Sequence, residues 1–265
     1  MSQQIDTAPS AAAATSAADM MIAMDHVTMR FGPKLVLDEL VLEAERGRVT
    51  VVMGGSGHGK STILKLIMGF MRPTAGRIFI DGQDVLDLSA EARQELQKMI
   101  GMSFQYSALF DSMTVFDNVA FPLREHTRLS ERDIAERVRT MLERMDLPGI
   151  EDKMPSDLSG GMKKRVGVAR AIMMQPKIML FDEPESGLDP VMATSIGELI
   201  TEMRDAFGMT CLVISHNLQT SMHIADKICM LYKGKIIAQG TPDILREDPN
   251  PILQQFLHGR AEGPY

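Results

Sequence analysis

Residues 54–61 read GGSGHGKS and fit the pattern G-x-x-x-x-G-K-[ST], which constrains the fold more than any other part of the sequence. This segment follows the apolar run VTVVM and precedes the helix-compatible stretch STILKLIMGF. A strand, a glycine-rich loop and a helix in this order let backbone N–H groups surround phosphate groups. The sequence therefore predicts an α/β fold that carries a phosphate-binding loop.

The residues of this loop have separate expected tasks. Its glycines let the backbone wrap the phosphates, Lys60 reaches the outer phosphates, and the Ser61 hydroxyl ligates Mg²⁺. The predicted nucleotide-binding residues of the loop are Gly54, Gly55, Ser56, Gly57, His58, Gly59, Lys60, Ser61 and Thr62.

Two later apolar runs end in polar residues that point to the same site. KIMLFDEP ends in Asp182 and Glu183, and TCLVIS is followed by His216. Short apolar runs are typical of parallel strands covered on both faces, and ligands bind at the carboxyl edge of such sheets. We expect Asp182 to face Mg²⁺, Glu183 to polarise an attacking water, and His216 to hydrogen-bond the terminal phosphate.

LSGGMKKRVGVAR, residues 158–170, predicts a second cradle for an anion. Ser159 can cap a helix, and Gly160 and Gly161 leave backbone N–H groups open at its start. The apolar spacing of the following VGVARAIMM continues the helix. We expect KKR, residues 163–165, to form a solvated or inter-subunit face of this helix.

The spacing of apolar residues divides the rest of the chain into a strand-rich region and a helical region. Alternating apolar and polar residues between Met24 and Met53 predict strands, and GRIFIDG at 76–82 continues this style. Residues 107–157 instead predict a helical insert. The residues expected on one helical face are Ile134, Val138, Met141, Leu142 and Met145, and Ser130 with Asp133 resembles a capping box.

Composition excludes several classes of protein. The net charge of −7 offers no basic footprint for nucleic acid. The uninterrupted apolar runs are shorter than the ~18 residues of a membrane span, and the N-terminus lacks the positive region of a secretion signal. Cys211 and Cys229 are unclustered and lie in apolar runs, which favours reduced thiols in the core of a cytosolic protein.

GGSGHGKST, SFQ, LSGGM, IMLFDEP, SGLD and SH occur in the order and approximate spacing of an ABC-type ATPase domain, which the chain resembles after residue 21. The resemblance implies an α/β P-loop NTPase core, a RecA-like mixed sheet with an antiparallel β subdomain, and a helical ABC-type subdomain. It implies ATP as the nucleotide, with Mg²⁺, and ATP hydrolysis. We expect a flexible lead at 1–21, the ATPase domain at 22–250 with its helical subdomain at about 107–170, and a tail at 251–265.

The resemblance also assigns roles to further residues. Phe31 resembles the aromatic residue that stacks on adenine, and Gln105 resembles the residue that contacts Mg²⁺ and the attacking water. Asp189 resembles the acid that communicates across a dimer. Two copies of the chain are implied to pack head to tail, so that Ser159, Gly160 and Gly161 of one copy cap the γ-phosphate held by the other. The catalytic residues expected on these grounds are Lys60, Gln105, Glu183 and His216, and the metal ligands are Ser61, Gln105 and Asp182.

Two stretches, YSALFDSMTVFDNVAFPLREHT at 106–127 and FLHGRAEGP at 256–264, resemble the ATPase subunits of bacterial Mla phospholipid transporters. This resemblance implies a peripheral protein on the cytoplasmic face of the inner membrane. Its implied partners are transmembrane permease subunits, an MCE-domain lipid-binding subunit and a STAS-domain protein, and the implied task is phospholipid transport between inner and outer membranes.

Three alternatives stay open. The ATPase subunit of another ABC importer, for a small solute, shares all of these motifs. A soluble ABC-type switch shares the core, but such proteins usually insert a long coiled coil or join two cassettes. A P-loop kinase explains Lys60 and Asp182 but leaves LSGG and His216 without a task.

Overall fold

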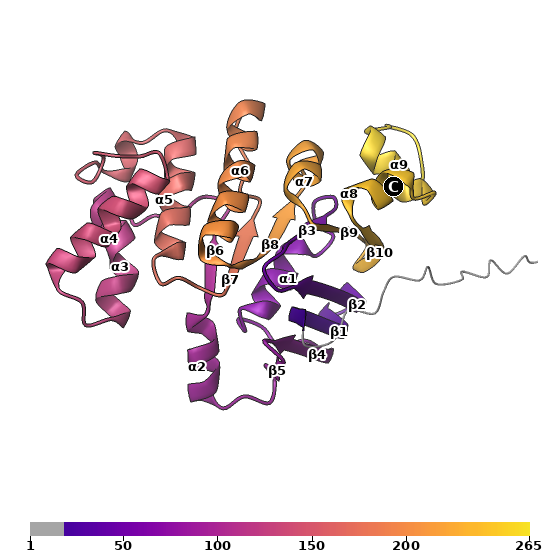
Figure 1. Cartoon of the computed structure of the whole chain (residues 1–265). Helices are drawn as coiled ribbons and strands as arrows, with labels where there is room; N and C mark the ends of the chain where they lie inside the picture. Colours follow the sequence, from indigo (N-terminus) through magenta and orange to yellow (C-terminus); the bar gives the residue numbers. More distant parts are fainter. Residues whose placement is uncertain (1–18) are drawn as a thin grey trace, which may run out of the picture.

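The computed structural model describes residues 19–265, and a mainly parallel six-stranded sheet forms their centre (Figure 1). Strand β3 pairs in parallel with β8 and β9, and β7 pairs in parallel with β8 and β6, whereas β10 runs antiparallel to β9. In spatial order the strands are β10 (Lys235–Gly240), β9 (Lys227–Tyr232), β3 (Val49–Met53), β8 (Thr210–Ser215), β7 (Ile178–Asp182) and β6 (Ile100–Ser103).

A second, antiparallel sheet covers one face of the first. Its strands in spatial order are β2 (Lys34–Glu45), β1 (Met20–Phe31), β4 (Ala75–Ile80) and β5 (Gln83–Asp84). β1 begins at Met20, inside the lead expected at 1–21, and residues 1–18 of that lead lie outside the described residues. The mixed sheet and the antiparallel β subdomain confirm the predicted fold class.

The apolar runs of the central strands are explained by two hydrophobic cores. In β8, Cys211 and Val213 pack into one core, while Leu212 and Ile214 pack into the other. Helix α1 (Lys60–Ile67) belongs to the core between the two sheets. Because both faces are covered, a strand of this sheet needs no polar side chain until it reaches the edge.

Helices cover the opposite face. The helical subdomain, predicted at about 107–170, contains α3 (Val115–His126), α4 (Glu131–Arg144), the short 3₁₀ turn η2 (Pro155–Asp157) and α5 (Gly160–Ile172), which lie together at the left of Figure 1. The predicted apolar face of α4 is buried, and the Ser130 hydroxyl accepts the Asp133 N–H at 3.2 Å. This confirms the predicted cap.

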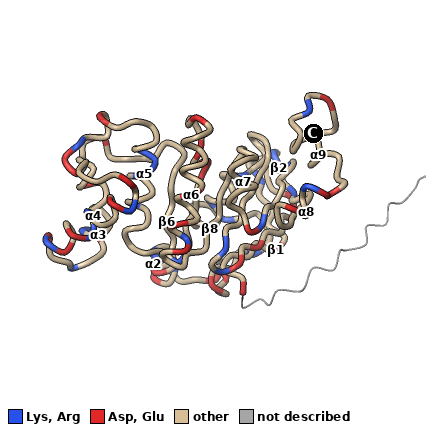
Figure 2. The backbone as a smooth tube through the Cα atoms, turned by 45° about the horizontal axis from the view of Figure 1, so that its top comes forward, with Lys and Arg blue, Asp and Glu red and all other residues tan. Residues whose placement is uncertain are grey.

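The remaining helices surround the sheets: α2 (Ala90–Lys98), α6 (Pro190–Phe207), α7 (Leu218–Ile224), α8 (Pro242–Glu247) and α9 (Pro251–His258). Among residues 19–265, no helix is both long and apolar enough to cross a membrane. Both charge signs occur along the outer side of α3 and α4 (Figure 2), where Arg124 pairs with Asp117 at 2.8 Å and with Glu131 at 2.7 Å.

Candidate active site

The glycine-rich loop runs from the end of β3 to the start of α1 and curls around the Lys60 ammonium group. Lys60 Nζ donates hydrogen bonds to the carbonyls of Gly54 at 2.7 Å and Gly55 at 2.9 Å. Gly54 has a φ of +152° and leaves no room for a Cβ against the Leu231 backbone, which explains why glycine is needed there. Burial lowers the pKa of Lys60, and the charges of Glu183 and Asp182 oppose this shift.

Asp182 ends β7 beside the loop. The Ser61 hydroxyl donates to Asp182 Oδ1 at 3.3 Å, so the two predicted metal ligands from distant parts of the chain meet. Burial and, next, the neighbouring Glu183 charge raise the pKa of Asp182, while the Ser61 hydrogen bond opposes the shift. A hydroxyl and a carboxylate oxygen at this separation fit the oxygen ligands that Mg²⁺ prefers.

Glu183 is the centre of the predicted catalytic residues. Its carboxylate accepts the Gln105 side-chain amide at 3.2 Å and lies 3.3 Å from His216 Nδ1 and 3.8 Å from Lys60 Nζ. Its backbone has a φ of +46°, an unusual conformation for a residue other than glycine, and its N–H donates to the Ile214 carbonyl at 2.9 Å. The strand edge thus holds Glu183 in a fixed orientation, as is common at functional sites.

A cleft of about 590 Å³ lies over these groups, within the size range of small-molecule sites. Phe31, at the end of β1, lines its rim and is 43% exposed. The other predicted residues that line the cleft are Ser56, Gly57, Gly59, Lys60, Ser61, Thr62, Gln105 and Glu183. His58 instead packs its ring against Tyr232 and Tyr265, with centroid distances of 5.2 Å and 5.7 Å.

The second predicted cradle is separate from this cleft. Ser159 caps α5 as expected, because its hydroxyl accepts the Met162 N–H at 3.3 Å. Ser159 and Gly160 are exposed, and neither they nor Gly161 line the cleft. Asp189 caps the neighbouring helix α6 and accepts the N–H groups of Val191 and Met192, both at 3.0 Å.

The expectation that residues 163–165 form a solvated face is wrong for Lys164. Its side chain is buried, and its ammonium group donates to the carbonyls of Gln105 and, at 3.4 Å, Glu183. Lys164 therefore connects α5 to both the Gln105 loop and the catalytic strand. Sequence reasoning missed it because a run of three basic residues does not reveal which one turns inward.

Two further residues fasten the Gln105 loop to α5. Arg170 donates to the carbonyls of Ser107 at 3.3 Å and Ala108 at 2.8 Å, and Gly167 allows the helix to approach Ser107 closely. A glycine within an otherwise good helix was the sequence signal for this close approach.

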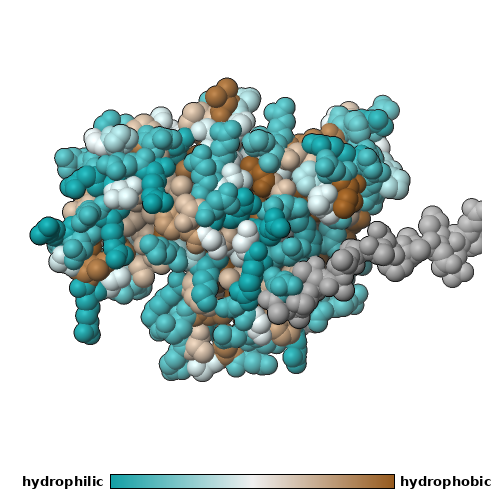
Figure 3. Space-filling view, viewed as in Figure 1, coloured by the Kyte–Doolittle hydropathy of each residue, from teal (hydrophilic) through white to brown (hydrophobic). Residues whose placement is uncertain are grey.

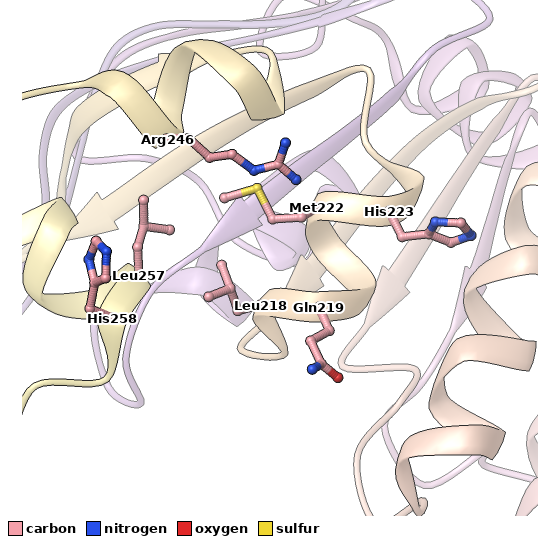
Figure 4. A pocket seen from close by; sticks show the side chains of 7 residues that line it. All are labelled: Leu218, Gln219, Met222, His223, Arg246, Leu257 and His258. Carbon is pink, nitrogen blue, oxygen red and sulfur yellow. The ribbon is translucent and has the colours of Figure 1, made fainter.

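A separate hollow lies between α7, α8 and α9 (Figure 4). Leu218 and Met222 from α7, Arg246 from α8 and Leu257 from α9 line it, and none of the predicted site residues does. The predicted site residues instead lie around the P-loop and its cleft and at the starts of α5 and α6.

The fold and the cleft define a P-loop nucleoside triphosphatase, since a glycine loop, a lysine and an acidic strand end meet at one sheet edge. Residues 37–186 match the model of the ABC transporter family. The chain belongs to this family, and it binds and hydrolyses ATP.

Known sequences and solved structures agree with this assignment. The chain is 41% identical to the intermembrane phospholipid transport system ATP-binding protein MlaF of Haemophilus influenzae, over 92% of each chain. It is 40% identical to the probable ribonucleotide transport ATP-binding protein mkl of Mycobacterium leprae, over 92% of this chain and 70% of the relative.

Among solved structures, cbiO1 of Clostridium perfringens, part of the ABC transporter complex cbiONQ, superposes with a TM-score of 0.80 and 31% identity, over 86% of this chain and 92% of that chain. The ATP-binding cassette MJ0796, a dimer in a post-hydrolysis state bound to ADP and Pi, superposes with a TM-score of 0.76 and 28% identity, over 84% of this chain and 99% of that chain.

Proposed function

We propose that this ATPase drives phospholipid transport between inner and outer membranes as a peripheral subunit on the cytoplasmic face of the inner membrane. The observation that carries the proposal is the match to MlaF of Haemophilus influenzae, which covers 92% of both chains at 41% identity. The segments 106–127 and 256–264, which resemble Mla-type ATPase subunits, support the same assignment.

We assign nucleotide binding to the cleft residues. The exposed ring of Phe31 stacks on the base, and the loop from Gly54 to Thr62 holds the phosphates. Lys60 leaves the carbonyls of its own loop to reach the outer phosphates. Ser61, Asp182 and Gln105 would hold Mg²⁺, which supplies charge neutralisation between the phosphates when bound.

Glu183 is assigned the role of general base. Its carboxylate accepts a hydrogen bond from Gln105 and lies beside His216. These contacts orient the carboxylate, so that it can accept a proton from a water in the cleft. Glu183 takes the proton of the attacking water. His216, which is half exposed, reaches toward the phosphate that leaves.

The second cradle is assigned to a partner. Ser159, Gly160 and Gly161 lie outside the cleft of their own chain, so a phosphate they bind must be held by a second copy. We propose a head-to-tail dimer in which each α5 start caps the γ-phosphate bound by the other P-loop. The solved relative described as a dimer with ADP and Pi supports dimerisation.

The membrane subunits are assigned to an apolar groove at the junction of the helical subdomain and the sheets. On the face shown in Figure 3, apolar residues gather near this junction. Phe104, Phe110, Phe121 and Met174 line the groove, which adjoins the Gln105 loop. A permease element seated here would sense the position of Gln105. We propose an MCE-domain subunit and a STAS-domain protein as the further partners of the complex.

Purification of the tagged chain from membranes in mild detergent tests this function. We expect permease, MCE-domain and STAS-domain subunits to co-purify, together with bound phospholipid identified by mass spectrometry. Phe121→Glu should abolish recovery of the permease without loss of ATP affinity, because a charge buried in an apolar contact is costly. The matched control is Ile244→Glu on α8, where the side chain is 57% exposed and lies outside the groove.

A small-solute importer is the second candidate, favoured by the relative named for ribonucleotide transport. Recovery of a solute-binding protein, with stimulation of ATP hydrolysis by ribonucleotides other than ATP, would support this candidate and contradict phospholipid transport.

A further inference from the structure

Tyr265 lies against the outer side of the P-loop, among aromatic residues from three other segments. Its ring centroid is 5.3 Å from those of Phe256 and Tyr232, and 5.7 Å from that of His58 within the loop itself. Its backbone N–H donates to Gln255 Oε1 at 2.6 Å, and the Tyr232 hydroxyl donates to the Pro264 carbonyl at 3.1 Å. These contacts fix the segment 263–265 in place.

Gly55 is the point at which this aromatic cluster meets the loop. A Cβ at residue 55 would overlap the phenol oxygen of Tyr265. Gly55 is absent from the described glycines with positive φ, so the backbone there does not itself require glycine. A side chain at residue 55 would therefore have to displace the tyrosine.

The same part of the loop is held from inside by the lysine of the site. Lys60 Nζ donates to the carbonyls of Gly54 and Gly55, and the Tyr265 phenol oxygen occupies the space directly beside Gly55. The peptide group between Gly54 and Gly55 is a rigid plane. A shift of Gly55 would therefore also move the Gly54 carbonyl that binds Lys60.

His58 gives a second contact between the cluster and the loop. Its ring stands edge-on to Tyr232, with an angle of 88° between the two planes. Its Nδ1 atom is buried without a hydrogen-bond partner among the described residues. Aromatic packing is thus what holds this ring, and Tyr265 supplies part of it.

We propose that Tyr265 is a positioning residue for nucleotide binding, which holds the P-loop at Gly55 and His58 in the shape that receives ATP. The inference rests on the proposed role of the P-loop in ATP binding. Tyr265 does not line the cleft, so it acts through the loop. A loop that is already ordered loses less entropy when the nucleotide binds, and affinity is higher for that reason.

The test measures the ATP dissociation constant of the full chain by calorimetry in a Glu183→Gln background, and KM and kcat in the otherwise unchanged chain. Tyr265→Ala should weaken ATP binding and raise KM by roughly 3- to 10-fold, the size expected for the loss of aromatic packing. The value of kcat should stay within about twofold, because the catalytic groups are untouched. Tyr265→Phe keeps the ring and should give a smaller increase in KM.

Gly55→Ala tests the contact from the other side. Its Cβ should expel the tyrosine and weaken ATP binding to a similar extent. Adding Tyr265→Ala to Gly55→Ala should cause little further loss, since both changes break one contact. The matched control is Phe70→Ala, which removes an aromatic ring that is 61% exposed and contacts none of the cluster.

The variant Lys60→Ala distinguishes an error in the role of Tyr265 from an error in the proposed role of the P-loop in ATP binding. If Lys60→Ala abolishes ATP binding while Tyr265→Ala and Gly55→Ala change it less than twofold, the positioning role is wrong and the P-loop assignment stands. Fully additive losses in the double variant also overturn the positioning role. If Lys60→Ala leaves ATP binding intact, both assignments are wrong.

Discussion

The P-loop and the start of α5 both present backbone N–H groups at a helix N-terminus, but their surroundings differ. The P-loop contains a buried lysine and faces Asp182 at the end of β7 and Glu183 directly after it. The start of α5 has only its own cap, Ser159, and an exposed glycine. The predicted catalytic residues therefore gather around the P-loop, whereas the start of α5 is proposed to add its N–H groups to a phosphate that a second copy holds.

Removal of the catalytic carboxylate should produce the largest difference between the two cradles. Glu183→Gln keeps the size of the side chain but removes its capacity to accept a proton. ATP hydrolysis should fall by roughly 10² to 10⁴ while ATP binding persists. The variant should also accumulate as an ATP-bound dimer on size-exclusion chromatography. Turnover close to that of the unchanged chain would exclude Glu183 as the base.

Mixing two defective chains tests whether the cradles cooperate across a dimer. One chain carries Lys60→Ala, the other carries Ser159→Arg, and both carry Glu183→Gln so that bound ATP is retained. Each variant alone should stay monomeric and hold little nucleotide. In a mixed dimer, one composite site is intact, so mixing should restore about one ATP per dimer if the cradles act in trans.

Nucleotide retention and complex size measure this recovery. Circular dichroism confirms that both variants are folded. If the two cradles served the same chain, every chain in the mixture would remain defective. Absence of recovery would then contradict the head-to-tail arrangement.

Lys164 is the residue through which the two cradles are connected within one chain. It lies on α5 and donates to the carbonyls of Gln105 and Glu183. Lys164→Met should lower the free energy of unfolding by about 1 to 3 kcal/mol, because buried carbonyls lose their donor. The ATPase rate should fall as well, since the Gln105 loop is no longer fixed. Chemical denaturation and steady-state kinetics measure both effects, with Lys163→Met as the matched control one residue away.

A stable Lys164→Met variant with an unchanged ATPase rate would contradict the connection. A loss of stability alone would limit Lys164 to a structural role. The neighbouring Lys163 is partly exposed and makes neither of these hydrogen bonds among the described contacts.

The sequence predicted those parts of the fold that depend on residues close together in the chain. Gly54, Lys60 and Ser61 lie in one short segment that runs from the loop into the start of α1, so their spacing determined their geometry. The apolar runs before Asp182 and His216 predicted two strand ends, and the parallel sheet brought them to the same edge as the loop. Periodicity and the Ser130 cap were sufficient to predict α4.

Contacts between distant segments could not be predicted in this way. The inward turn of Lys164 depends on where the Gln105 loop crosses α5, and the packing of Tyr265 against Gly55 joins residues 210 positions apart. No periodicity or spacing encodes such contacts. The unusual backbone of Glu183 has the same origin, because the neighbouring strand fixes it through Ile214.

The smallest expected effect is on thermal stability, and it comes from the partly buried Asp182 carboxylate beside the P-loop. Burial and the Glu183 charge raise the pKa of Asp182 above its ordinary value of 3.8. The ionised carboxylate is therefore disfavoured in the folded protein at neutral pH, and protonation relieves this cost as the pH falls through the raised pKa. Asp182→Asn removes the charge and should raise Tm at pH 7 by on the order of 2 °C, while it impairs Mg²⁺-dependent hydrolysis.

Calorimetric Tm values between pH 7 and pH 4 distinguish this electrostatic strain from a simple change in packing. The difference in Tm between Asp182→Asn and the unchanged chain should become smaller as the pH falls, because Asp182 of the unchanged chain is then neutral as well. The matched control is Asp189→Asn at the start of α6, which keeps a good helix cap on an exposed site. It should change Tm less at pH 7. A lower Tm for Asp182→Asn at pH 7 would mean that the interactions with Ser61 and Lys60 outweigh burial, and that the P-loop cradle is not strained.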